Sequence, residues 1–255
     1  MGKIIVLANQ KGGVGKTTCA VNIAAGIARL DKKVLLVDID PQGNATSGNG
    51  VNKRSVSLSA YDMLCSGEKA EDVIIKNVSP NLDIIPSSMN LAGAEIELVS
   101  FEDREARLKK ALSLVRDKYD FIFIDCPPSL GLLTINALCA CDTVIIPIQC
   151  EYYALEGLSQ LMNSIRTVKR MYNPNIAVEG VVLTMYDGRM NLTIQVANEV
   201  KKFFPNKVYK TPIPRNIRLS EAPGFGKSIF YYDNTSRGAK AYLELCEEII
   251  KANNR

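Results

Sequence analysis

The sequence predicts an α/β protein built on a doubly wound, mostly parallel sheet with helices on both faces. Short apolar runs alternate with helix-length segments along the chain. The runs are apolar at successive positions, as strands buried on both faces of a parallel sheet are. A glycine-rich loop follows the first run, where such folds bind phosphate. At 255 residues the chain fits a single open sheet, so we expect one domain over 1–255.

The apolar runs and the spacing of apolar residues give the expected elements in order. Strands are expected at 3–8, 34–39, 82–85, 121–125, 143–148 and 178–184. Helices are expected at 16–29, 103–118 and 153–171, with a further amphipathic helix near the C-terminus. The stretch 42–59, rich in Gly, Asn and Ser, is predicted to be a loop, and the proline-rich stretch 205–227 an irregular connection. In a sheet of this kind, ligands bind at the carboxyl ends of the strands.

The loop after the first run has the sequence KGGVGKTT at 11–18. Glycines let successive backbone N–H groups point at phosphate, and the helix beginning at Lys16 adds its positive N-terminal end. Lys16 can reach the β- and γ-phosphates of a nucleotide, and the Thr17 hydroxyl can bind Mg²⁺. The strict P-loop pattern requires glycine at position 10, where this chain has Gln10 and then an extra lysine, Lys11. The loop therefore predicts a P-loop nucleotide hydrolase of a deviant type.

Carboxylates end two of the expected strands. Asp125 closes the apolar run FIFID, the pattern of an acid at a strand tip near Mg²⁺. Asp38 and Asp40 end the second strand, and we expect Asp38 to bond Thr17 or a water on the metal. Asp40 is expected to orient the attacking water, because phosphoryl transfer depends on positioning and electrostatics.

The composition excludes several kinds of site. The chain has no His, so His-based nucleophile systems and His metal ligands are impossible, and it has no Trp on which a base could stack. Its seven cysteines lack C-x-x-C spacing and are expected to be reduced, packed thiols. We find no secretory signal, no myristoylation pattern and no run near the roughly 18 apolar residues that span a bilayer. We therefore expect a cytoplasmic protein without a membrane partner.

The net charge of +4 comes from one segment of the chain. Residues 185–227 carry eight basic and three acidic residues, whereas the rest of the chain is close to balanced. Such a segment can bind anions or nucleic acid, although charge alone favours an ordinary solvated surface.

Five motifs together resemble the ParA/Soj family of deviant Walker ATPases, which partition chromosomes and plasmids, and the likeness is greatest to the chromosomal Soj type. The motifs are KGGVGKTT at 11–18, VDIDPQGNATSG at 37–48, DCPPSLGLLTINAL at 125–138, QCEYYALEGLSQL at 149–161 and PRNIRLSEAPGFGKSI at 214–229. The resemblance covers essentially the whole chain and implies one ParA-type ATPase domain over 1–255. We find no N-terminal helix-turn-helix extension of the kind that large plasmid homologues carry.

The resemblance implies a role for each motif. Lys11 would reach the partner's nucleotide across an ATP-dependent homodimer, and Gly12 would lie where the two protomers meet. Asp40 would be the catalytic carboxylate, and Asp125 the Walker B residue that acts with Mg²⁺. The residues implied to bind the nucleotide are Lys11, Gly12, Gly13, Val14, Gly15, Lys16, Thr17, Thr18, Met185, Pro214, Arg215 and Asn216.

The resemblance also implies macromolecular partners. The ATP-bound dimer would bind double-stranded DNA without sequence preference, in the nucleoid, and hydrolysis would release it. The basic residues that match this role are Arg189 and Arg218, with Lys201, Lys202 and Lys227 as supports. A ParB-type centromere-binding protein would stimulate the weak hydrolysis, and a link to replication initiation belongs to the same family pattern.

Three alternatives remain open from the sequence. A membrane-associated division-site ATPase of the MinD type has the same loop but needs a C-terminal membrane helix, which the polar ending disfavours. An iron–sulfur reductase like the nitrogenase iron protein would need two cysteines per protomer at the dimer face, and Cys126, Cys139, Cys141 and Cys150 are the available ones. A nucleotide-binding scaffold without catalysis is disfavoured by the intact Lys16, Asp40 and Asp125.

Overall fold

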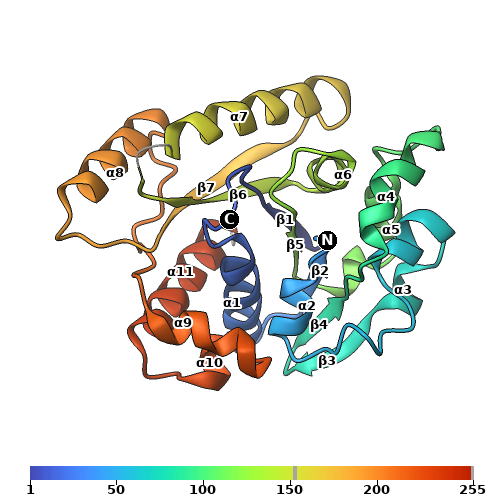
Figure 1. Cartoon of the computed structure of the whole chain (residues 1–255), viewed down its shortest axis with the longest axis horizontal. Coiled ribbons are helices and arrows are strands. Elements are labelled where there is room, and N and C mark those ends of the chain that lie inside the picture. Colours follow the sequence, from blue (N-terminus) through green and yellow to red (C-terminus); the bar gives the residue numbers. More distant parts are fainter. Residues whose placement is uncertain (152–153, 254–255) are drawn as a thin grey trace.

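A seven-stranded sheet forms the centre of the computed structural model, which describes residues 1–151 and 154–253 (Figure 1). The strand order is β3-β4-β2-β5-β1-β6-β7, and every neighbouring pair is parallel except β3 and β4. The strands are β1 (Lys3–Leu7), β2 (Val34–Asp38), β3 (Ile75–Ser79), β4 (Leu82–Ile85), β5 (Phe121–Asp125), β6 (Thr143–Gln149) and β7 (Ala177–Thr184). The predicted fold class is confirmed, and each predicted strand agrees with an observed one to within one residue at each end.

The antiparallel edge strand β3 was not predicted. Its sequence IKNVS is largely polar and its side chains are exposed or half-buried, so it lacks the apolar run that identifies a strand buried on both faces. A tight turn with Asn81 at φ 61° returns the chain into β4. The Pro80–Asn81 pair is typical of such a turn and was the available signal.

Helices cover both faces of the sheet. They are α1 (Lys16–Arg29), α2 (Asn44–Gly48), α3 (Ala70–Val73), α4 (Leu91–Glu97), α5 (Arg107–Ser113), α6 (Leu132–Ala140), α7 (Ala154–Met171), α8 (Asn191–Phe203), α9 (Ile217–Glu221), α10 (Ile229–Tyr232) and α11 (Arg237–Asn253). Short turns of other helical types are η1 (Asp62–Ser66), η2 (Leu98–Ser100), η3 (Arg116–Lys118) and η4 (Ala222–Phe225). Helices α4 to α8 pack on one face, and α1, α10 and α11 on the other.

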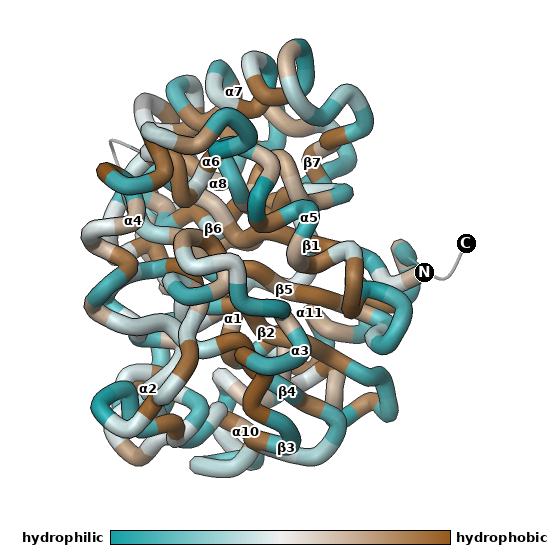
Figure 2. Tube along the Cα trace, turned by 90° about the vertical axis from the view of Figure 1, so that its right-hand side faces the viewer, coloured by the Kyte–Doolittle hydropathy of each residue, from teal (hydrophilic) through white to brown (hydrophobic). Residues whose placement is uncertain are grey.

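Alternating side chains of the central strands divide the core into two halves. In β1, Ile4 and Val6 face the α4–α8 side, whereas Ile5 and Leu7 face α1 and α11. Figure 2 shows this arrangement as hydrophobic strands enclosed by helices with hydrophilic outer turns. The continuous apolar runs of the sequence follow from this burial on both faces.

Three segments differ from their sequence-based prediction. The helix expected at 103–118 is broken into α5 and η3, where Arg116 leaves the helix to donate from Nε to Gly2 O and to pair with Asp142, both at 2.6 Å. The loop expected at 42–59 contains α2, and the connection expected at 205–227 contains α9 and η4. The helix expected at 153–171 is α7, and position 153 lies outside the described residues.

The terminal helix α11 docks on α1, as its apolar stripe predicts. Tyr242, Leu245 and Ile249 on this stripe are at most 1% exposed. Gly26 of α1 permits the close approach, because a Cβ there would lie 2.5 Å from the Cys246 sulfur. Within the described residues, no helix has the length and hydropathy required to cross a membrane.

Candidate nucleotide site

The glycine-rich loop lies between β1 and α1, at the carboxyl edge of the sheet. Gly13 and Gly15 have φ of 75° and 86°, a left-handed conformation that favours glycine. Within the described part of the chain, no side chain caps α1 and no acid occupies its first turn. The positive end of α1 is therefore open to an anion.

Two contacts fix the shape of this loop. The Thr184 hydroxyl, at the end of β7, donates to Val14 O at 2.8 Å. Lys16 Nζ donates to Lys11 O at 3.0 Å, which closes the loop across its own turn. The Lys16 side chain is 7% exposed, and burial lowers its pKa while Asp125, Cys126 and Asp40 oppose that change. A buried ammonium bonded to a single carbonyl is prepared to exchange that contact for a phosphate.

Two buried carboxylates meet beside the loop. Asp38 and Asp125 are register partners at the ends of β2 and β5, and both are 0% exposed. Neither oxygen of Asp125 has a hydrogen-bond partner among the described residues. Burial, then the charge of Asp38, raise the pKa of Asp125 well above its usual value, and Thr17 and Lys16 offset part of this rise. Asp125 is therefore the one of the two whose oxygens accept no hydrogen bond from the described residues, with the Lys16 ammonium as its opposite charge.

The expected bond between Asp38 and Thr17 is wrong. Asp38 Oδ2 accepts from Thr46 N and from Thr46 Oγ1, both at 2.7 Å, and its Oδ1 accepts from Asp40 N. Thr46 belongs to α2, a helix that lies within the predicted loop at 42–59, so this competing donor was not predicted. Burial still raises the pKa of Asp38 to about 6, and its role near a metal stays a prediction.

The donor set beside the loop fits Mg²⁺. The unpartnered oxygens of Asp125 are hard ligands, and burial has removed the water that would otherwise solvate them. Among residues 1–151 and 154–253, no group of three or more His, Cys, Asp and Glu can hold a metal ion. Mg²⁺ needs no such group, because it is usually held by one or two protein ligands together with phosphate and water.

The Asp125→Asn substitution is expected to stabilise the nucleotide-free protein at neutral pH. Replacing a buried, unpartnered charge by a neutral amide removes a cost of about 1–3 kcal/mol, or more for a charged group. Thermal unfolding should therefore show a melting temperature higher by about 2–4 °C for each kcal/mol gained. The variant should also lose any stabilisation by nucleotide with Mg²⁺. A melting temperature below that of the unchanged protein would show that Asp125 is not a buried charge without a partner.

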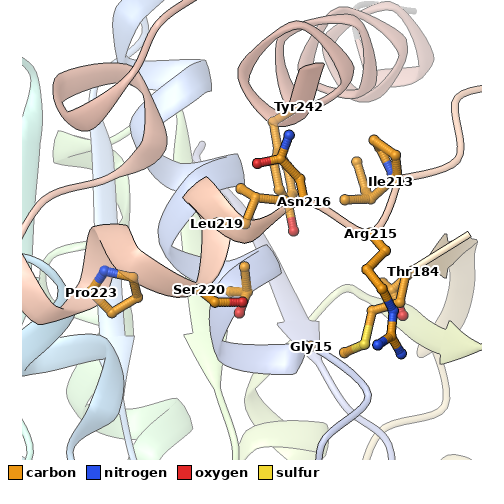
Figure 3. A pocket seen from close by; sticks show the side chains of 12 residues that line it. Gly15, Thr184, Ile213, Arg215, Asn216, Leu219, Ser220, Pro223 and Tyr242 are labelled. Carbon is orange, nitrogen blue, oxygen red and sulfur yellow. The ribbon is translucent and has the colours of Figure 1, made fainter. Parts of the chain in front are cut away.

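A cavity of about 310 Å³ adjoins the loop at Gly15 and Thr18. The segment before α9 forms one wall, because Tyr186 N donates to Ile213 O at 2.9 Å and holds it beside the end of β7. Figure 3 shows Arg215 and Thr184 near Gly15, and Leu219, Ser220 and Pro223 on the α9–η4 side. The structure brings together the predicted residues Met185, Pro214, Arg215 and Asn216 around this cavity.

Lys11 is engaged within its own chain. Its Nζ pairs with Glu151 at 2.7 Å, and both side chains are partly exposed. The adjacent Gly12 is exposed, and a Cβ placed on it would meet no described atom within 4 Å. Neither residue is among those that line the cavity beside Gly15.

The predicted basic segment does not form one free surface. Arg189 makes a two-point ion pair with Asp187, Arg218 lies 2.9 Å from Glu221 and 3.5 Å from Asp233, and Lys202 lies 2.7 Å from Glu199. Arg215 lines the nucleotide cavity instead, while Lys207 and Lys210 line a different cavity. The two remaining basic residues are Lys201, on α8 at the left of Figure 1, and Lys227, which follows η4.

The four cysteines available to an iron–sulfur cluster are packed thiols. Cys126, Cys139, Cys141 and Cys150 are all buried, and burial raises the pKa of each. Iron–sulfur clusters are held by thiolates, and a raised pKa disfavours that form.

Sequence reasoning missed three residues that shape the site. Thr184 clamps the loop, Glu151 holds Lys11, and Tyr242 of α11 lines the base cavity with its hydroxyl 3.3 Å from the Cys19 sulfur. Thr184 is the last residue of a predicted parallel strand. Because ligands bind at the carboxyl ends of such strands, this position could have indicated that Thr184 lies near the site. Tyr242 and Glu151 are distant in sequence from the loop and gave none.

Known proteins resemble this chain along its whole length. A family model described as an AAA domain matches residues 2–178. The sporulation initiation inhibitor protein Soj of Bacillus subtilis is 61% identical, over 98% of each chain. The chromosome partitioning protein ParA of Myxococcus xanthus is 49% identical, over 98% of this chain and 89% of its own.

Solved structures share the fold. Cobyrinic acid a,c-diamide synthase from Mycobacterium smegmatis with bound ADP and magnesium has a TM-score of 0.86 and 33% identity, over 98% of this chain and 95% of that one. A plasmid partition protein from Borrelia burgdorferi bound to AMPPNP has a TM-score of 0.81 and 28% identity, over 99% and 100%.

Proposed function

Because the chain belongs to the Soj/ParA family of chromosome-partitioning ATPases, we propose that ATP assembles two copies into a dimer that binds DNA and that hydrolysis releases it. The observation that carries this proposal is the site itself: an open helix end, a buried ammonium on Lys16 and an unpartnered carboxylate on Asp125, side by side. In this proposal residues 1–255 act as one ATPase domain.

ATP and Mg²⁺ are the ligands of this site. The loop amides from Gly12 to Thr18 and the Lys16 ammonium would hold the phosphates, and Asp125 and Thr17 would hold Mg²⁺, with Asp38 behind them. When bound there, Mg²⁺ would supply positive charge that offsets the negative charge developing during phosphoryl transfer. The base would occupy the cavity between Met185 and the Pro214–Asn216 segment.

Asp40 would orient the attacking water. Asp40 is 7% exposed, and its Oδ1 accepts a hydrogen bond from Gln42 N at 2.9 Å. Its negative charge raises the pKa of Lys16 and of Asp125, so it lies close to both. A carboxylate fixed by its own turn at the carboxyl edge can hold a water for in-line attack. The loop at 11–18 itself contains no Arg, which fits slow hydrolysis until a partner stimulates it.

Lys11 and Gly12 would form the dimer contact. The Glu151 pair holds Lys11 on the outer surface of the loop, with its side chain 33% exposed and within reach of a second chain. Two copies facing each other through this edge would each receive the other's Lys11 at the nucleotide. Exposed ion pairs contribute at most about 1 kcal/mol, so a phosphate can replace Glu151.

DNA binding would use Arg189 and Arg218, supported by Lys201, Lys202 and Lys227. The acids that hold three of these residues are exposed or partly exposed, so DNA phosphates can compete with them at modest cost. Each phosphate contact adds about −0.9 to the slope of log affinity against log salt, so doubling the contacts by dimerisation changes affinity steeply. A ParB-type protein would stimulate release, and the protein would act in the cytoplasm on the nucleoid.

The terminal helix disfavours the membrane-associated alternative. In α11, the apolar stripe that would enter a lipid surface is the one buried against α1. Flotation with anionic vesicles and ATP tests this directly, and we expect no bound protein.

The proposal predicts ATP-gated, salt-sensitive binding to nonspecific duplex DNA. Binding is measured with ATP, with ADP and without nucleotide, at two salt concentrations. Arg218→Ala should weaken the ATP state and lower the salt slope by about 1 per protomer, because it removes a phosphate contact. Lys109→Ala, at an exposed lysine on α5, is the matched control and should bind as the unchanged protein does. DNA binding that ignores the nucleotide would overturn the proposal.

A further inference from the structure

A second polar cavity lies at the opposite edge of the sheet from the nucleotide loop. Its volume is about 710 Å³, and its walls come from the starts of β1, β6 and β7, from the 206–210 segment and from the end of α11. The segment 207–209 runs beside β7, where Val181 N donates to Lys207 O and Tyr209 N donates to Val181 O. No role described above uses this cavity.

Two of the residues that line it carry a hydroxyl with no hydrogen-bond partner in the described part of the chain. Thr143 Oγ1 and Tyr209 Oη are buried, and neither has a hydrogen-bond partner among the described residues. Thr143 is only 8% exposed, and the Tyr209 ring lies over Gly180, where a Cβ would come within 2.5 Å of it. A buried hydroxyl without a partner costs free energy, so two in one cavity wall need an explanation.

The charged groups of the cavity are unequally engaged. Glu248 accepts from Lys210 N, Thr211 N and Thr211 Oγ1, all within 2.9 Å. Glu179 accepts from Asn253 at 2.8 Å and lies 3.6 Å from Lys3 Nζ. Within the described part of the chain, by contrast, the ammonium groups of Lys207, Lys210 and Lys251 have no carboxylate within ion-pair distance. The acids are already satisfied, and the cavity presents positive charge.

We propose that this cavity binds a small anion that carries phosphate groups. Lys207, Lys210 and Lys251 supply the charge, and the Thr143 and Tyr209 hydroxyls supply hydrogen-bond donors. Burial and the nearby Glu179 and Glu248 raise the pKa of Tyr209, so its hydroxyl remains a donor at neutral pH. A rigid DNA duplex fits less well, because two of the donors are buried in the wall of a concave site.

The two hydroxyls allow a test that does not disturb folding. Tyr209→Phe and Thr143→Val remove unpartnered oxygens and keep the shape of each side chain, so neither should lower the melting temperature. The protein is first saturated with ADP and Mg²⁺ to fill the nucleotide site. Inorganic pyrophosphate is then titrated at constant free Mg²⁺, and binding is followed by calorimetry.

We expect one additional binding site for pyrophosphate. Its affinity should fall about fivefold or more in Tyr209→Phe, in Thr143→Val and in Lys251→Ala. Lys109→Ala should bind pyrophosphate as the unchanged protein does. The proposal would be overturned if no additional site is found. It would also be overturned if Tyr209→Phe and Thr143→Val both bind pyrophosphate with the affinity of the unchanged protein. If a short DNA duplex displaces pyrophosphate, and if Tyr209→Phe weakens binding of that duplex, the cavity would be assigned to DNA instead. None of these outcomes depends on dimerisation or hydrolysis.

Discussion

The Gly12→Val substitution is expected to leave a folded chain that binds ATP but does not dimerise. A Cβ placed on Gly12 meets nothing within 4 Å among the described residues, so the protomer itself leaves room there and the proposed obstacle is the second protomer. In a twofold dimer the substitution acts at both copies, and overpacking of about 1–3 kcal/mol at each weakens association about thirtyfold or more. ATP-dependent DNA binding should fall with it.

Sedimentation with ATP, together with fluorescent-nucleotide binding, checks this expectation. Gly224→Val is the matched control, because a Cβ at Gly224 also meets nothing within 4 Å but lies on η4, away from the phosphate loop. The control should dimerise at the same ATP concentration as the unchanged protein. Normal dimerisation of Gly12→Val would show that the protomers do not meet at this loop.

The second large effect is expected for Asp40→Ala, which should separate binding from turnover. Loss of a water-orienting carboxylate should slow hydrolysis by about 10²- to 10⁴-fold. The phosphate loop and Asp125 are untouched, so ATP-dependent DNA binding should persist. The protein should then remain on DNA long after the unchanged protein has been released.

Single-turnover hydrolysis and the rate of dissociation from DNA measure the two effects on one preparation. Asp72→Ala removes an exposed carboxylate on α3 and serves as the control for charge alone. If Asp40→Ala hydrolyses ATP at the unchanged rate, Asp40 is not the catalytic carboxylate. If it fails to bind ATP, its role is structural.

The parts of the site that are contiguous in sequence were the predictable ones. The unit from β1 through the loop to α1 was predicted with its glycines, its lysines and its helix start at Lys16, because loop chemistry and burial both appear in the local sequence. The side chains that complete it were not, because they come from distant elements. Thr46 captures Asp38 from a helix hidden in a polar stretch, and Thr184 clamps the loop from β7.

The basic residues also show that contacts between distant parts of the chain could not be predicted from the sequence. Composition located the excess in residues 185–227, yet folding distributes it over unrelated surfaces. Arg215 turns to the nucleotide cavity, Lys210 to the cavity at the far edge, and Arg189 to its own Asp187. Counting charges along a chain cannot reveal which of them already have partners.

The short helix α9 contributes both to the cavity beside the phosphate loop and to the position of Arg218. Leu219 and Ser220 line the base cavity, the cap residue Asn216 does so as well, and Arg218 projects from the same turn toward Glu221. A mutation that reshapes the cavity for another base would therefore also move the arginine. Under the proposed function, substitutions in this turn would be pleiotropic: natural variation should change base preference and DNA affinity together rather than one at a time.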